Sequence, residues 1–152
     1  ARRAKRNGKA SRAAGLDWLG LILDSSLIIS AERQGQTAYQ MIEGFGARLG
    51  DPEIAVSVVT VLELAHGIAR ADTGVRRSTR QQFLDDLLTG MPVHVVNVQV
   101  ALRAGHLDGS LQSQGIRVAL ADLLIGATAL ELGYSVATHN VRHFRLIPSL
   151  PV

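Results

Sequence analysis

The stretch 19-LGLILDSSLIIS-30 places a single carboxylate, Asp24, within an almost wholly apolar run. A short apolar run that ends in polar residues is typical of a buried strand. Such a strand has little reason to contain an acid, because an unpaired charge away from water is costly. The run therefore predicts that the strand ends at Asp24. The acid then either caps a helical turn that follows or serves in chemistry.

Three further strand patterns follow this run and alternate with helical patterns. The strand patterns lie in residues 51–59, 92–98 and 134–140, and the helical ones in 36–50, 60–71, 76–91, 99–115 and 120–133. This alternation predicts an α/β fold with a central, mostly parallel sheet of four or five strands and helices on both faces. A fifth strand would be an edge strand in the irregular segment 144–152. We predict one domain over residues 17–152.

The basic character of the chain comes from its first 16 residues. The net charge is +3, yet residues 1–16 hold six of the 16 Lys and Arg residues and no acid. The rest of the chain has ten arginines, no lysine and 13 acidic residues. We predict that residues 1–16 form a disordered extension, because nothing hydrophobic anchors them. Such an arm either contacts nucleic acid or is an upstream extension with no role in the domain.

Composition excludes several classes of protein. Without a lysine in the predicted domain there is no P-loop, which needs a lysine on the phosphates. Without cysteine there is no disulfide framework, thiolate nucleophile or cysteine zinc site, which suits a cytoplasmic location. No apolar run reaches the roughly 18 residues of a membrane-spanning helix, so we expect no membrane partner.

Three carboxylates, Asp24, Glu63 and Asp122, fall where predicted strands end or helices begin. Glu63 has a structural alternative as the fourth residue of a Thr-x-x-Glu capping box, and Asp122 has one in the helix macrodipole. In a parallel sheet, however, all three positions meet at the carboxyl edge, where α/β sheets bind ligands. Clustered carboxylates repel unless a cation lies among them, and oxygen ligands suit Mg²⁺ or Mn²⁺. Such a site can activate water and attack a phosphodiester.

The segment after the last predicted strand adds polar groups to the same edge. Thr138 and Asn140 leave the strand end, and His143 follows three residues later. Asn140 has an alternative role in capping the turn. His143 has one as a half-buried histidine that touches no ligand.

Four motifs in this order resemble the PIN-domain family, and most closely its VapC-type toxins from type II toxin–antitoxin pairs. The first motif, 21-LILDSSLIIS-30, carries Asp24 and Ser26, and the second, 56-VSVVTVLELAHG-67, carries Glu63. The third, 119-ALADLLIGATALELG-133, carries Asp122. The fourth, 136-VATHNVRHF-144, carries Thr138, Asn140 and Phe144. The chain departs from the family pattern at His143, where the family has a fourth acid.

The resemblance implies a metal-dependent endoribonuclease that cuts structured RNA such as tRNA or rRNA. Asp24, Glu63 and Asp122 would be the catalytic residues and hold Mg²⁺ or Mn²⁺, with His143 as a fourth candidate ligand. Ser26, Thr138 and Asn140 would orient these groups. The resemblance also implies an inhibitory VapB-type antitoxin, a homodimer and a larger toxin–antitoxin complex.

Arg142 and Arg145 are candidates for contacts with RNA phosphates, or are solvated surface charges. Two other functions stay open. One is a non-catalytic PIN-like module that binds RNA or a partner, which the histidine at position 143 favours. The other is a phosphatase of the haloacid-dehalogenase kind, which also begins with a strand ending in aspartate. That class needs a second aspartate two residues later, where this chain has Ser26.

Overall fold

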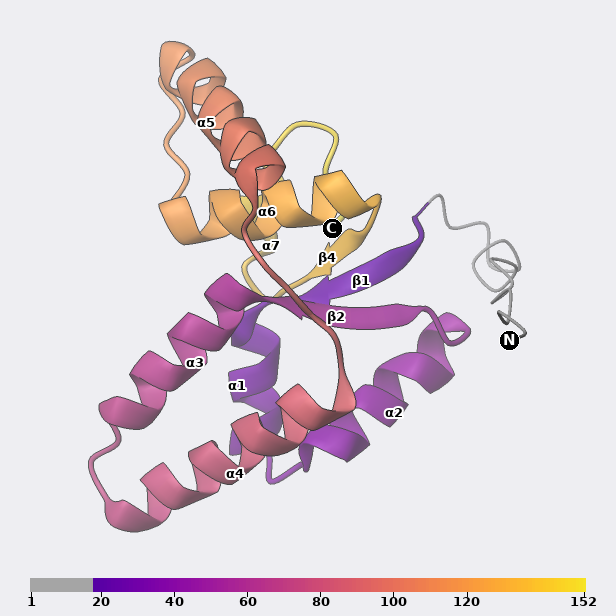
Figure 1. The fold of residues 1–152 in the computed structure, drawn as a ribbon, viewed down its shortest axis with the longest axis vertical. Helices are drawn as coiled ribbons and strands as arrows, with labels where there is room; N and C mark the ends of the chain where they lie inside the picture. Colours follow the sequence, from indigo (N-terminus) through magenta and orange to yellow (C-terminus); the bar gives the residue numbers. More distant parts are fainter. Residues whose placement is uncertain (1–17) are drawn as a thin grey trace, which may run out of the picture.

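The computed structural model describes residues 18–152 of the chain (Figure 1). Its four strands form one parallel sheet in the order β3-β2-β1-β4. The strands are β1 Gly20–Leu23, β2 Glu53–Ser57, β3 Val93–His94 and β4 Ser135–Ala137. Within the described residues, seven helices join them: α1 Ser25–Arg33, α2 Ala38–Leu49, α3 Val58–Ala69, α4 Gly74–Gly90, α5 Val98–Ser113, α6 Leu120–Leu132 and α7 Val141–Phe144. The α/β prediction is confirmed. The predicted extension, residues 1–16, lies outside the described part.

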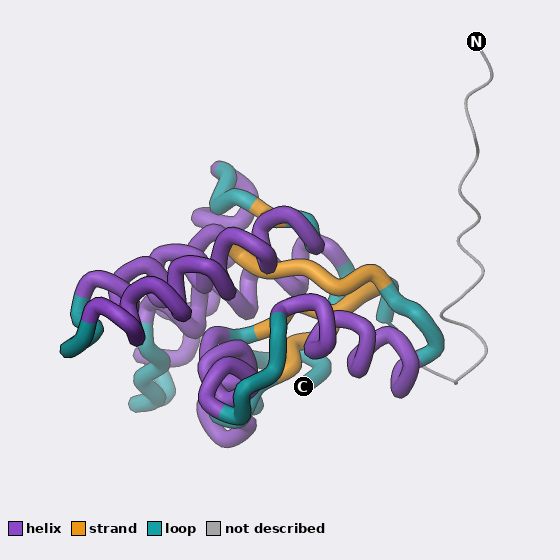
Figure 2. Tube along the Cα trace, turned by 90° about the horizontal axis from the view of Figure 1, so that it is seen from below, coloured by secondary structure: helices purple, strands orange, loops and turns teal. Residues whose placement is uncertain are grey.

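Helices cover both faces of the sheet, as Figures 1 and 2 show. Because side chains alternate along a strand, Leu21 and Leu23 of β1 face one layer, where they pack in a core with α1, α2, α3 and α4. Ile22 faces the other layer and packs with Ile125 of α6 and Phe144 of α7. All strand side chains near the middle of the sheet are buried, which explains why these strands read as continuous apolar runs.

Three local predictions need correction. The segment after Asp24 forms a full helix, α1, rather than a short turn. Helix α3 begins at Val58, two residues earlier than the pattern predicted, because Ser57 caps it by accepting a hydrogen bond from the Val59 amide. The predicted third strand, 92–98, is reduced to the two residues of β3. No helix among residues 18–152 is long and apolar enough to cross a membrane.

The prediction of a possible fifth strand in residues 144–152 was wrong. This segment ends α7 and continues in turns. Its last residues nevertheless cover the free edge of β4, because the Pro151 carbonyl accepts hydrogen bonds from the Val136 amide and the Ser135 hydroxyl, both at 2.9 Å. Proline has no amide hydrogen with which to continue a ladder, so the edge is closed without a fifth strand.

A close approach between β1 and the start of β4 explains one glycine. A Cβ atom at Gly20 would lie 2.6 Å from Cζ of the Tyr134 ring and 2.9 Å from the Glu53 carbonyl oxygen. Burial raises the pKa of Tyr134, and the Glu53 carboxylate raises it further. The hydroxyl therefore stays protonated beside this carboxylate. Only glycine leaves room on β1 for the ring.

We expect Gly20→Ala to lower the free energy of unfolding by about 1–3 kcal/mol, the usual cost of forcing a methyl group into a packed site. Urea unfolding followed by circular dichroism measures this. Gly109→Ala is the control, because a Cβ there meets nothing within 4 Å and alanine favours a helix by about 0.5–1 kcal/mol. An unchanged midpoint for Gly20→Ala would mean that the Tyr134 ring moves aside at no cost.

Candidate active site

The carboxylate of Asp24 is buried at the carboxyl end of β1 and is only 3% exposed. Two hydroxyl groups donate to its Oδ2 atom: Ser26 Oγ at 2.7 Å and Thr138 Oγ1 at 2.8 Å. Asp24 occupies the N-cap position of α1, but its side chain makes no capping hydrogen bond. The capping alternative is therefore wrong for the side chain, which is held by the two hydroxyls instead.

The loop between β4 and α7 fixes both hydroxyls. The His139 amide donates to Ser26 Oγ at 3.0 Å, and the Asn140 amide donates to Thr138 Oγ1 at 2.8 Å. Because each hydroxyl oxygen already accepts from the backbone, its hydrogen is free for Asp24. Asn140 thus acts through its backbone: it occupies the N-cap of α7 without a side-chain capping bond. Asp24 Oδ1 is left free of both hydroxyls.

Glu63 lies on the second turn of α3 and not at a helix cap. Since Ser57 is the N-cap, the predicted Thr-x-x-Glu capping box is wrong. Thr60 is fully buried and donates instead to the Leu23 carbonyl at 3.4 Å, which ties α3 to the end of β1. The Oε2 atom of Glu63 is buried and has no hydrogen-bond partner among residues 18–152.

Burial is the main cause that raises the pKa of Glu63, and the Asp24 and Asp122 carboxylates raise it further. A hydrogen bond from the Ser25 hydroxyl lowers it. The motif analysis did not assign Ser25 to the site. Ser25 could have been considered from the sequence, because both Ser25 and Ser26 follow Asp24 and the motif assigned only Ser26 to the site.

Asp122 lies in the first turn of α6, where the helix macrodipole favours a negative charge. The structural role predicted for it is therefore compatible with a role in the site. Burial raises its pKa most, and the Asp24 carboxylate raises it further, whereas His143 lowers it. His143 Nδ1 lies 3.6 Å from Asp122 Oδ2, and the histidine side chain is 66% exposed. The structure therefore brings His143 to the edge of the carboxylate group rather than into the core.

Arg142 and Arg145 lie on or just after α7, and both are exposed. Neither forms an ion pair with an acidic side chain in the part of the chain that the structure describes. They flank His143 in the sequence, so both predicted roles, RNA contact and solvated charge, stay open.

The chemistry of these groups fits a hard divalent cation. Asp24, Glu63 and Asp122, with one buried Glu63 oxygen that has no hydrogen-bond partner among residues 18–152, offer the oxygen ligands that Mg²⁺ and Mn²⁺ prefer. Among residues 18–152, no three His, Cys, Asp or Glu side chains lie close enough to hold an ion as they stand. The side chains would have to close around the cation.

The fold and the carboxylates at the sheet edge point to one family of proteins. A model of the PIN domain matches residues 21–148, and the chain belongs to the PIN-domain family. A protein named Ribonuclease VapC1 from Rickettsia felis is 31% identical over 137 residues, which cover 88% of this chain and 95% of that protein. Ribonuclease VapC10 from Mycobacterium tuberculosis is 31% identical over 130 residues, which cover 86% and 90%.

Solved structures give the same picture of the fold. The chain is similar to VapBC-1 from nontypeable Haemophilus influenzae, with a TM-score of 0.71, 26% identity and coverage of 86% and 94%. It also resembles VapBC2 from Rickettsia felis bound to a DNA fragment from their promoter, with a TM-score of 0.73, 22% identity and coverage of 86% and 95%. The predicted resemblance to the PIN-domain family and its VapC-type members is confirmed.

The raised pKa values predict a pH-dependent stability. A carboxyl group with a raised pKa binds its proton more tightly in the folded state, so stability falls as pH rises above the ordinary pKa. Without divalent metal, Glu63→Gln and Asp122→Asn should therefore each raise the melting temperature at pH 7.5. The gain should disappear once the pH falls below the ordinary values, 4.5 for glutamate and 3.8 for aspartate. Calorimetry in EDTA measures both effects.

Glu43→Gln on α2, an exposed position, is the matched control and should change little at either pH. Lower melting temperatures for both site variants at pH 7.5 would contradict the interpretation. The carboxylates would then contribute more through their hydrogen bonds than they lose through burial and mutual repulsion.

Proposed function

We propose that this chain is a metal-dependent endoribonuclease toxin that hydrolyses phosphodiester bonds in structured RNA such as tRNA or rRNA, and that a VapB-type antitoxin inhibits it. The observation that carries the proposal is that Asp24, Glu63 and Asp122 converge at the carboxyl edge of the sheet, where burial mainly, and the Asp24 carboxylate in addition, raise the pKa of Glu63 and Asp122. Repulsion among these carboxylates costs stability, and a bound divalent cation would relieve it. The ribonuclease names of the VapC relatives support the same reaction.

Each side chain has a definite role in this proposal. Ser26 and Thr138 hold Asp24 through its Oδ2 atom, and the three carboxylates would bind Mg²⁺ or Mn²⁺. Bound divalent metal supplies an activated water and stabilises charge on the phosphate. Arg142 and Arg145 contact flanking RNA phosphates. The alternative is a PIN-like module that binds RNA or a partner without cutting it, and an RNA cleavage assay separates the two.

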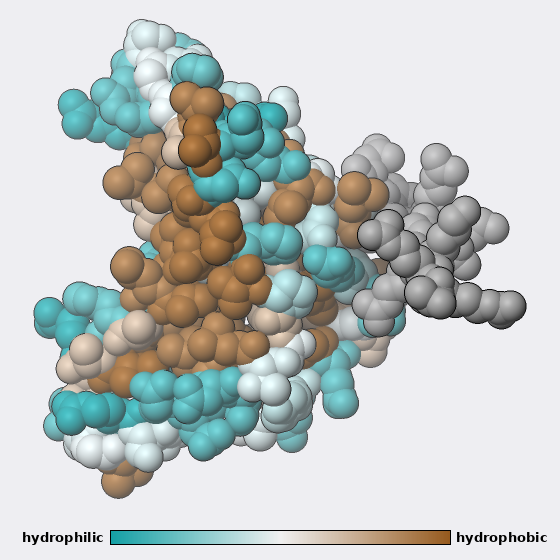
Figure 3. Space-filling view, viewed as in Figure 1, coloured by the Kyte–Doolittle hydropathy of each residue, from teal (hydrophilic) through white to brown (hydrophobic). Residues whose placement is uncertain are grey.

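A homodimer and a complex with antitoxin belong to the same proposal. Figure 3 shows hydrophobic surface on the face between α5 and α3. The exposed hydrophobic residues of α3, α5 and the start of α6 include Leu62, Val98, Leu102 and Leu120. Exposed apolar surface of this kind marks interaction sites. The solved VapBC structures are toxin–antitoxin pairs in their own organisms, which supports an antitoxin as one partner.

We expect Asp24→Asn, Glu63→Gln and Asp122→Asn each to lower RNA cleavage by at least about a hundredfold, because each removes a charge that the reaction needs. Cleavage of total bacterial RNA, followed by gel electrophoresis and growth inhibition in cells, measures this. EDTA should abolish the activity of the wild type, and added Mg²⁺ or Mn²⁺ should restore it.

Asp108→Asn on α5, a partly exposed position, serves as the charge-matched control, and circular dichroism shows whether each variant is folded. Full activity of Asp122→Asn in EDTA would rule out the metal-dependent nuclease. Folded wild-type protein that binds RNA in Mg²⁺ or Mn²⁺ without cutting it would favour the non-catalytic module.

His143 predicts which metal is preferred. Its position 3.6 Å from Asp122 lets an imidazole nitrogen take the place of the family's fourth acid. Imidazole suits Mn²⁺ better than Mg²⁺, which prefers oxygen and keeps its waters. We expect faster cleavage with Mn²⁺ than with Mg²⁺ in the wild type, and expect His143→Asp to raise the Mg²⁺-dependent rate. Equal rates with the two metals, together with an unaffected His143→Ala variant, would leave a site of three carboxylates only.

A further inference from the structure

A polar pocket of about 200 Å³ lies between α1 and α2 and reaches the loop after β4. Leu27 and Gln34 line it from α1, and His139 lines it from the loop. At 3.6 residues per turn, these α1 side chains lie on the side of the helix opposite Ile28 and Ile29, which line an apolar cavity between α1, α3 and α4. The polar pocket is therefore separate from that cavity.

Two hydrogen bonds connect the polar pocket to the carboxylates. The His139 amide donates to Ser26 Oγ at 3.0 Å, and Ser26 Oγ donates to Asp24 Oδ2 at 2.7 Å. Leu27, which lines the pocket, directly follows Ser26 in the chain. A ligand in the pocket would therefore lie next to the residues that hold Asp24.

The amide side chains of the lining keep capacity for further hydrogen bonds. Gln40 Oε1 accepts from the Thr37 amide at 2.9 Å, and this bond leaves both hydrogens of the Gln40 amide group for a ligand. Gln34 Nε2 donates to Ser30 Oγ at 3.2 Å, which leaves its carbonyl oxygen and a second hydrogen. Gln36 adds a third amide. The pocket thus offers donors and acceptors together.

The charge and the rings of the lining suit a nucleotide. Arg48 lines the pocket, and among residues 18–152 it forms no ion pair. No acidic side chain of the described residues lines the pocket. Phe45 and His139 supply two flat rings. Unpaired RNA bases stack on Phe, His or Arg side chains and form hydrogen bonds through their polar edges, and the lining contains groups for both.

We propose that this pocket binds one unpaired nucleotide of the RNA substrate beside the bond that is cut. Its glutamine amides contact the base edge, a ring stacks on the base, and Arg48 contacts a phosphate. The inference rests on the proposed ribonuclease function and adds a substrate-binding subsite to it.

The size and chemistry of the pocket favour RNA over a segment of a protein partner, which is the competing occupant. A cavity of about 150 Å³ already holds benzene, so about 200 Å³ has room for a base. Glutamine amides pair with the edges of bases, and an arginine without a neighbouring carboxylate in the lining attracts a phosphate. A purely apolar segment would leave these amides without partners.

Gln40→Glu tests the pocket while keeping the fold. Glutamate suits the capping box at the start of α2 as well as glutamine does, so the contact with Thr37 is kept. The change removes amide donors and adds a negative charge that repels a phosphate. Gln99→Glu is the matched control, because it adds the same charge in the first turn of α5, at an exposed position outside the pocket.

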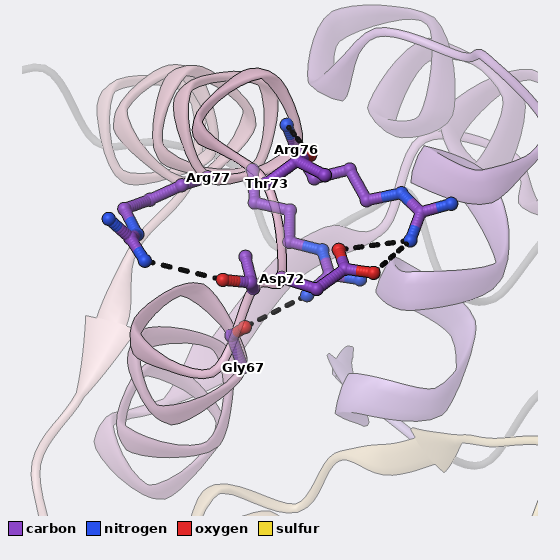
Figure 4. A network of polar contacts seen from close by, with 7 residues as sticks. Gly67, Asp72, Thr73, Arg76 and Arg77 are labelled. Atoms are coloured by element: carbon purple, nitrogen blue, oxygen red, sulfur yellow. Dashed lines mark hydrogen bonds and ion pairs between the residues drawn. The ribbon is translucent and has the colours of Figure 1, made fainter.

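Arg48→Gln tests the phosphate contact separately. Its matched control is Arg76→Gln on α4, because Arg76 is also exposed but forms an ion pair with Asp72 far along the chain from the pocket lining, as Figure 4 shows. Arg48→Gln should weaken the binding of a nucleotide and leave the binding of the corresponding nucleoside unchanged.

Binding can be measured without knowledge of the natural RNA. In methyl NMR spectra of the full chain in EDTA, adenosine 5′-monophosphate should shift the signals of Leu27 and Met41, which line the pocket. This probe is chosen because a glutamine amide pairs with adenine through two hydrogen bonds. Ile28 and Ile29, on the other side of α1, should shift less, and so should all signals with inorganic phosphate. Gln40→Glu should abolish the effect of the nucleotide.

Cleavage gives the second measurement. At low concentrations of total bacterial RNA, Gln40→Glu should cut about five- to a hundredfold more slowly than the wild type, the usual effect of losing one stacked base. At saturating RNA the rate should recover, because the change removes binding and not chemistry. Gln99→Glu should match the wild type at both concentrations, whereas Asp24→Asn should be slow at both.

Three results would overturn the inference. The first is that the signals of Leu27 and Met41 do not respond to adenosine 5′-monophosphate. The second is that inorganic phosphate shifts them as much as the nucleotide does, which would leave an anion site that reads no base. The third is a Gln40→Glu variant that cuts normally but no longer binds its antitoxin, which would assign the pocket to the protein partner.

The failure of this inference and the failure of the proposed function are distinguishable. In each of the three cases the wild type would still cut RNA, so the proposed function would stand. If Asp24→Asn cuts RNA as well as the wild type, the proposed function fails whatever the pocket binds.

Discussion

The site depends on one buried carboxylate held by two hydroxyl groups. Asp24 is almost inaccessible to water, and Ser26 and Thr138 both donate to the same oxygen. The Thr138 contact joins positions 114 residues apart and connects the end of β1 with the end of β4. Because the loop amides of residues 139 and 140 fix both hydroxyls, the position of Asp24 is set by the sheet itself. Helices α3 and α6 then bring Glu63 and Asp122 to the same edge of the sheet.

This arrangement has an electrostatic cost that the rest of the fold must cover. Burial and like charge raise the pKa of Glu63 and Asp122, so the folded chain is less favourable at neutral pH than a neutral site would be. The sheet can support that cost because both of its faces are packed: Leu23 and Val56 are fully buried on one face, and Ile22 and Ala55 on the other. A divalent cation would remove much of the repulsion, which links metal binding to stability.

The surroundings of the carboxylates are not uniform. On one side stands the exposed imidazole of His143, next to Asp122. On the other side Glu63 borders an apolar cavity with arginines at its mouth. In the proposed ribonuclease, the first difference would bear on which metal binds.

The sequence by itself determined the alternation of strands and helices, the parallel sheet and the four motifs that carry Asp24, Glu63, Asp122 and Thr138. These features are local, since apolar runs, helix-ending glycines such as Gly50 and Gly133, and short motifs can each be read within about ten residues. Tertiary structure alone decided the role of each polar group. It showed that α3 starts at Val58, which removes the capping role from Glu63, and that the chain end covers β4 without forming a strand. The cavity between α1, α3 and α4 was also beyond the sequence, because a cavity depends on how three helices pack and not on the pattern within any one of them.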